Sequence, residues 1–71
     1  MERRYRVVDA SAVVAYMHRI NDSRWVVANL TTDKMRWYHN FDRALIALHR
    51  IASTRGTWVD AYDYDNRRNE R

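Results

Sequence analysis

The stretch from Met35 to Gly56 constrains the fold of this chain more than any other, because it combines a strand pattern, a helix start and a helix stop. Its first part, residues 35–41, alternates large apolar and polar residues, as strands do. Asp42 is the predicted N-cap, where a carboxylate accepts hydrogen bonds from the free amides of the first helical turn. Gly56, the only glycine, stands where helix C-termini favour a left-handed residue. The sequence therefore predicts a strand followed by a helix over residues 42–55.

The predicted helix is amphipathic. At about 100° per residue, its apolar residues gather on one side; they are Ala44, Leu45, Leu48, Ile51 and Ala52. Arg43 and Arg50 lie on or near the opposite side. Phe41 and Ile46 have the spacing of a hydrophobic staple around the cap. We therefore expect the helix to lie with its apolar side on a sheet.

Three further segments have the composition and alternation of strands; they are residues 1–8, 24–31 and 57–62. Residues 9–23 fit two patterns. As a helix, the segment is capped by Asp9, and as a strand it ends in a hairpin loop at residues 21–23. Its alanines favour the helix and its paired valines favour the strand, and the helix is our prediction.

These elements predict a small α+β domain over residues 1–66, with the helix at 42–55 packed on one face of an antiparallel sheet. With a helix at 9–23, the order of elements is that of a ferredoxin-like βαββαβ fold. With strands there, it is a β-meander plus one helix. The polar segment 67–71 is predicted to be a disordered tail.

The length of the chain limits its core. A chain of 71 residues buries only about 60% of its unfolded surface, and without cysteine it has no disulfide to add stability. Three tryptophans, five tyrosines and one phenylalanine supply large buried areas instead, and a homodimer would supply more. The sequence has neither a membrane-spanning apolar run nor a signal peptide, so we expect a soluble, cytoplasmic protein.

Catalysis and cofactor binding find little support in the sequence. A single glycine excludes a glycine-rich phosphate loop, and no serine has a patterned His-Asp context. The three histidines have no ligand spacing, and zinc sites without cysteine are uncommon. We therefore predict no enzyme activity, no cofactor, no metal site and no small-molecule substrate.

A binding surface is predicted on the sheet. A two-residue turn at Thr32-Asp33 would place Leu30 opposite Met35 and sort the two flanking strands into two faces. The more apolar set, Val26, Ala28, Leu30, Met35 and Trp37, is expected to face the helix. The uncovered side would then carry Trp25, Val27, Arg36, Tyr38, Trp58 and Tyr62.

Three coverings fit that surface: a nucleic acid, a protein partner, or a second copy of the chain or its own N-terminal segment, and we expect a homo-oligomer. Thirteen Lys and Arg against nine Asp and Glu give a net charge of +4, which favours anionic partners. The leading prediction is regulatory nucleic-acid binding, with bases stacked on Trp25 and Tyr38 and phosphates on Arg36. Arg43 and Arg50 are a second candidate, on a helix that would lie along duplex DNA. The alternative is a protein-binding adaptor or inhibitor of the kind carried by phages or plasmids, using the same aromatics as anchors.

Overall fold

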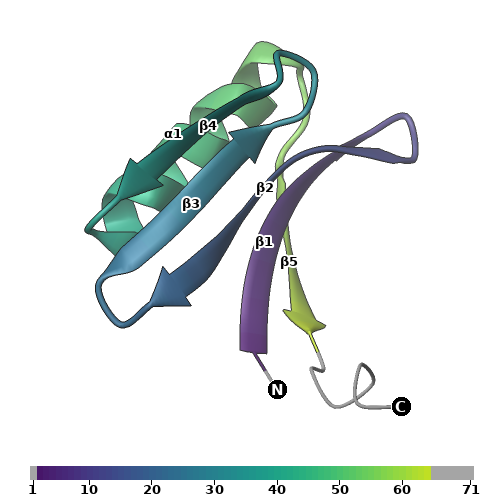
Figure 1. The fold of residues 1–71 in the computed structure, drawn as a ribbon. Coiled ribbons are helices and arrows are strands. Elements are labelled where there is room, and N and C mark those ends of the chain that lie inside the picture. The colour runs from purple at the N-terminus through teal and green to yellow at the C-terminus, as the bar shows by residue number, and fades with distance from the viewer. Residues whose placement is uncertain (1, 65–71) are drawn as a thin grey trace.

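The computed structural model describes residues 2–64, so the tail predicted at 67–71 lies outside the described residues. Five strands and one helix follow one another along the chain (Figure 1): β1 (Glu2–Asp9), β2 (Ala12–Asn21), β3 (Arg24–Asn29), β4 (Lys34–Tyr38), α1 (Phe41–Thr54) and β5 (Val59–Tyr64). The strands form one antiparallel sheet in the order β4-β3-β2-β1-β5, and α1 packs on one of its faces. The predicted small α+β fold with a long helix on one sheet face is confirmed.

Residues 9–23 form a strand hairpin, so the helix predicted there is wrong and the β-meander arrangement is correct. The turn from β1 into β2 is Ala10-Ser11, and both residues have positive φ, at 53° and 69°. A two-residue turn with two positive φ angles matches the right-handed twist of the strands it joins. Such turns usually contain Asn-Gly or Asp-Gly, and this one contains neither. Its alanine instead strengthened the helix pattern.

The N-cap of the helix is Asn40, two residues before the predicted cap. Asn40 has an extended backbone, and its side-chain oxygen accepts a hydrogen bond from the amide of Arg43 at 3.1 Å. Asp42 therefore lies in the first turn, where its charge favours the helix dipole. The predicted staple does not form either, because Ile46 is 54% exposed, whereas the Phe41 ring packs edge-on against Tyr5.

The helix ends as the sequence predicts. Gly56 has a φ of +72°. The amide of Thr57 donates to the carbonyl of Ala52 at 2.9 Å, and the amide of Gly56 donates to that of Ser53 at 3.1 Å. These two bonds are those of a Schellman motif, which satisfies carbonyls that the last helical turn leaves free.

The loop between β3 and β4 has four residues, Leu30–Asp33, so the predicted two-residue turn is wrong. Asn29 pairs with Lys34 and Trp25 with Tyr38, which shifts the register by two residues from the prediction. Because side chains alternate with a period of two, this shift leaves the two predicted sets of residues on their shared faces.

The orientation of those two sets is the reverse of the prediction. Trp25, Val27 and Tyr38 lie on the helix side of the sheet and pack against the core, whereas Met35 and Trp37 are 60% and 55% exposed on the other side. The reason lies in β2. Met17 pairs with Val27 on one neighbour and with Tyr5 on the other, so these residues continue the same apolar face across the sheet.

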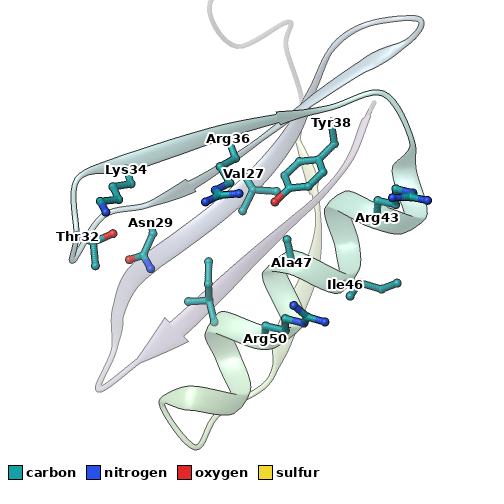
Figure 2. Close-up of a pocket in the computed structure, with 11 residues that line it drawn as sticks. Val27, Asn29, Thr32, Lys34, Arg36, Tyr38, Arg43, Ile46, Ala47 and Arg50 are labelled. Atoms are coloured by element: carbon teal, nitrogen blue, oxygen red, sulfur yellow. The ribbon is translucent and has the colours of Figure 1, made fainter.

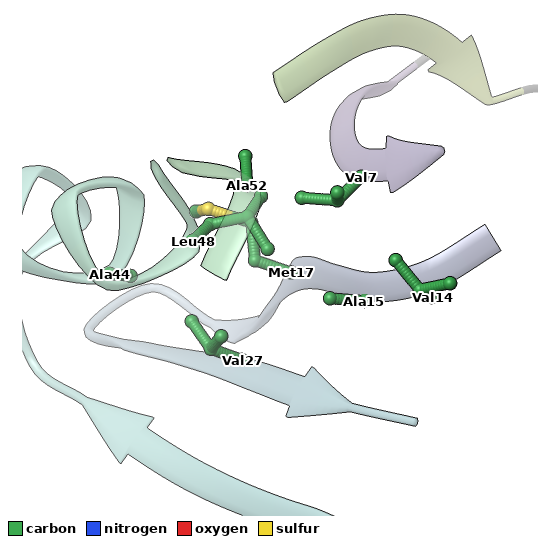
Figure 3. Close-up of a cluster of buried hydrophobic side chains, with 8 residues drawn as sticks. All are labelled: Val7, Val14, Ala15, Met17, Val27, Ala44, Leu48 and Ala52. Carbon is green, nitrogen blue, oxygen red and sulfur yellow. The ribbon is translucent and has the colours of Figure 1, made fainter. Parts of the chain in front are cut away.

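The core lies between α1 and the strands at the centre of the sheet (Figure 3). Its buried members are Val7, Val14, Ala15, Met17, Val27, Ala44, Leu48 and Ala52. The helix contributes the predicted apolar side, with Leu48 fully buried. Val26 and Ala28 are also buried, at 3% and 4% exposure, but on the opposite face and outside this cluster. We call that second face, which no helix of residues 2–64 covers, the open face.

Candidate nucleic-acid interface

A groove runs between β4 and α1 on the helix side of the sheet (Figure 2). Its volume is about 780 Å³. The residues that line it are Val27, Asn29, Thr32, Lys34, Arg36, Tyr38, Arg43, Ile46, Ala47, Arg50 and Ile51. Four of them are cations and none is acidic, and we call this feature the cationic groove.

Strand β4 forms one wall of the cationic groove. It is an edge strand, and its pairing with β3 places Lys34, Arg36 and Tyr38 on the helix side, beside Asn29, Val27 and Trp25 respectively. Successive residues on one strand face are about 6.6 Å apart. The two cations and the tyrosine therefore form a row along the rim, and in Figure 2 their side chains point toward the helix.

Helix α1 forms the other wall. Arg43, Ala47 and Arg50 are spaced i, i+4 and i+7, so they share one side of the helix. Arg43 and Arg50 are exposed, and Ala47 between them is half-buried against the core. The helix thus presents two guanidinium groups with a small apolar residue between them.

The cations of the groove have no acidic partner in the described part of the chain. Five ion pairs form within residues 2–64: Arg3–Asp63, Arg4–Glu2, Arg6–Asp60, Arg19–Asp22 and Arg55–Asp9. Every one of them lies outside the groove. Within residues 2–64, the ion pairs therefore engage other arginines of the chain, and the groove is lined by four cations and no carboxylate, an arrangement that favours anionic ligands.

The open face carries rings and arginines that are already engaged with each other. The Arg6 guanidinium lies 4.3 Å from the centre of the Tyr62 ring and donates to Asp60 at 2.9 Å. The Arg4 guanidinium lies 3.8 Å from the centre of the Tyr64 ring. A guanidinium stacked on a ring occupies the face that a nucleobase would use. This half of the open face is therefore poorly suited to stacking bases.

The other half of the open face is apolar. Met35 and Trp37 stand there exposed, beside the buried Val26 and Ala28 of the next strand. The Arg24 guanidinium lies 6.0 Å from the Trp37 ring centre. Exposed apolar residues grouped on one face are typical of an interaction surface.

The predicted binding residues fall into three places. Arg36, Tyr38, Arg43 and Arg50 come together in the cationic groove. Trp25 packs at the edge of the core, its ring centre 6.1 Å from that of Phe41. Tyr62 lies on β5, at the opposite edge of the sheet from β4, and Trp58 directly precedes that strand and is 74% exposed. The seven residues therefore do not form a single surface.

Sequence reasoning missed Lys34 as a groove residue and Trp37 as an exposed ring. The signal for Lys34 was its alternation with Arg36 and Tyr38 on the same strand face. Trp37 carried no such signal, because its exposure depends on which face the helix covers.

His18 is a titratable residue whose surroundings shift its pKa. The pKa of His18, on the open face, is lowered from 6.5, chiefly by burial and then by the nearby Arg4, while Glu2 acts in the opposite direction. Within residues 2–64, no three His, Asp or Glu side chains gather closely enough to hold a metal ion. The one helix described is too short and too polar to cross a bilayer.

No protein-family model, curated protein or solved structure matches this chain.

Proposed function

We propose that this protein binds nucleic acid in the cationic groove. The observation that carries the proposal is the absence of any carboxylate partner, within residues 2–64, for Lys34, Arg36, Arg43 and Arg50. Four like charges on facing walls repel one another, and a polyanion between them replaces this repulsion with attraction. A phosphodiester chain does so and releases its own counterions, which drives association.

The arginines of the groove suit phosphate in particular. A guanidinium offers a planar fork of donors that matches two phosphate oxygens at once. Arg36 on the strand and Arg50 on the helix approach the groove from opposite walls, so a bound backbone would receive donors from both sides.

A protein partner, or a second copy of this chain, is the second candidate function. It is favoured by the apolar half of the open face, where Met35 and Trp37 are exposed. Aromatic residues and methionine are enriched in protein interfaces. This surface is separate from the cationic groove, so the two functions are distinguishable by mutation.

The response of affinity to salt tests the nucleic-acid proposal. If all four groove cations meet phosphates, log K should fall against log salt with a slope of about −3. Fluorescence anisotropy with a labelled oligonucleotide, titrated at several salt concentrations, measures that slope. An affinity that does not change with salt concentration, or the absence of binding at low salt, would refute the proposal.

Charge reversal at Arg36 locates the interface. Arg36→Glu replaces an unpaired groove cation, and we expect affinity for an oligonucleotide to fall at least about tenfold, with a shallower salt slope. Arg3→Glu is the matched control, because Arg3 is also an exposed strand arginine, and its ion pair with Asp63 lies outside the groove. Equal losses in the two variants would mean that net charge, not the groove, governs binding.

A further inference from the structure

We infer that the cationic groove takes a single strand with unpaired bases and discriminates against duplex. This inference rests on the proposed function and concerns the form of nucleic acid that the same site selects. The feature that carries it is the floor of the groove. Besides its cations, the groove is lined by three apolar residues that we call its floor: Val27, which belongs to the buried core, and Ala47 and Ile51, which pack against that core.

An apolar floor gives a duplex no advantage. In a double helix the bases are stacked and paired inside, and the groove would meet mainly phosphates and sugars. Pressing a phosphate against Val27 and Ile51 removes its water and replaces it with no donor. The cations on the walls would still attract a duplex, but the floor would oppose close contact.

A single strand uses both parts of the groove. Its phosphates meet cations on the walls, and an unstacked base turns inward and buries its apolar faces on the floor. Tyr38, on β4, adds an aromatic ring to the lining of the groove. It is half-buried, and Figure 2 shows it pointing from β4 toward α1. Base stacking of this kind tolerates any sequence, because every base has a flat face.

The size of the groove agrees with this mode of binding. Its volume of about 780 Å³ lies within the range of about 300–1,000 Å³ over which clefts enclose drug-sized ligands. A nucleobase is smaller than such ligands, so the groove has room for a base and its sugar. Lys34 and Arg36 are two positions apart and share one face of β4. Their side chains can contact successive phosphates of the strand that carries the bound base.

The test compares one labelled oligonucleotide of about 12 nucleotides, single-stranded and annealed to its complement, by anisotropy at the same series of salt concentrations. We expect the single strand to bind about tenfold more tightly. Ala47→Leu fills the floor without changing any charge, and leucine is a good helix former. In this variant the single strand should lose that advantage and bind like the duplex, with its salt slope unchanged.

His49→Leu is the matched control, because His49 is exposed on the same helix and does not line the groove. It should keep the preference for the single strand. Inorganic polyphosphate, which has charge but no bases, should compete less well than unlabelled single strand at equal phosphate concentration.

Three results would overturn the inference. If single strand and duplex bind equally with the expected salt slope, the proposed function stands and the selection of single strands fails. The same holds if Ala47→Leu leaves the preference intact. If neither nucleic acid binds, both the proposed function and this inference fail.

Discussion

His18 shows how a single residue ties stability to pH. It lies half-buried on the open face beside the Tyr16 ring, and burial, followed by the charge of Arg4, lowers its pKa below 6.5. His18 therefore binds a proton less tightly in the folded state than in the unfolded chain. The contribution of His18 to stability is complete above the unfolded pKa and is lost as the pH falls below it.

We accordingly expect the thermal midpoint to be lower at about pH 5 than at about pH 7.5, and His18→Gln to reduce that difference. Melting curves followed by circular dichroism measure both. His49→Gln, at an exposed helix position, is the control and should preserve the wild-type dependence. A His18→Gln protein with the full wild-type difference would show that other groups cause it.

Single residues on the helix were predicted well because local rules determine them. Leu48 and Ala52 fall on the predicted apolar side and are buried, and Gly56 has the left-handed backbone that its position requires. The exposure of Trp37 is different in kind. Nothing local distinguishes Trp37 from Trp25, since both are aromatic residues in adjacent strands, and only the packing of the whole sheet assigns their faces.

Among the elements, α1 is capped by Asn40 and not by the predicted Asp42. Asn40 and Asp42 both belong to residue types that cap helices. The structure selects Asn40, which lets Phe41 enter the first turn and reach the rings of Tyr5 and Trp25. The observed cap is thus accompanied by aromatic contacts with β1 and β3, which local helix-start patterns do not include.

Removal of this cap provides a test at the same scale. Asn40→Ala should lower the free energy of unfolding by about 1 kcal/mol, because the Arg43 amide loses its acceptor. Asp42→Ala should cost less, since Asp42 contributes only through the helix dipole. Urea titration gives both values. A larger loss in Asp42→Ala would contradict the assignment of the cap.

Strand β2 was the element that sequence reasoning misjudged, and the consequences extended beyond it. The Ala10-Ser11 turn has no glycine or asparagine to mark it, so the segment was predicted as a helix. Without β2 in the sheet, nothing connected Met17 to Val27. The faces of β3 and β4 were then judged from their own residues alone, which pointed the wrong way.

For the molecule as a whole, one small core holds the sheet and the helix together. Leu48 is fully buried and is among the largest buried side chains. Leu48→Ala should therefore lower the free energy of unfolding by about 2–5 kcal/mol. That is a large part of the about 5–15 kcal/mol typical of folded proteins. Ile46→Ala, at an exposed helix position, should change it far less.

Urea titrations followed by far-ultraviolet circular dichroism and by tryptophan fluorescence measure this loss with two probes. We expect the two transitions to coincide in the wild-type protein, because the helix packs its apolar side on the sheet and shares one core with it. Separate transitions would show that the sheet survives without α1.

The overall distribution of charge was only partly predictable. The net charge and the arginine count are visible in the sequence, but which cations find carboxylates depends on the pairing of β1 with β5. That pairing brings Asp60 to Arg6 and Asp63 to Arg3. The sequence does not show that Asp60 and Asp63 pair with arginines of β1, nor that four other cations line one groove without a carboxylate among them.

The two cations of β4, Lys34 and Arg36, lie on an edge strand of the sheet, where charged side chains oppose aggregation. An outermost strand offers free backbone groups to any other chain, and charged side chains are a common safeguard against such self-association. Lys34 and Arg36 supply that safeguard here. Exchanging both for neutral residues should therefore promote aggregation and, under the proposed function, weaken nucleic-acid binding. Acidic replacements should abolish that binding and still prevent aggregation.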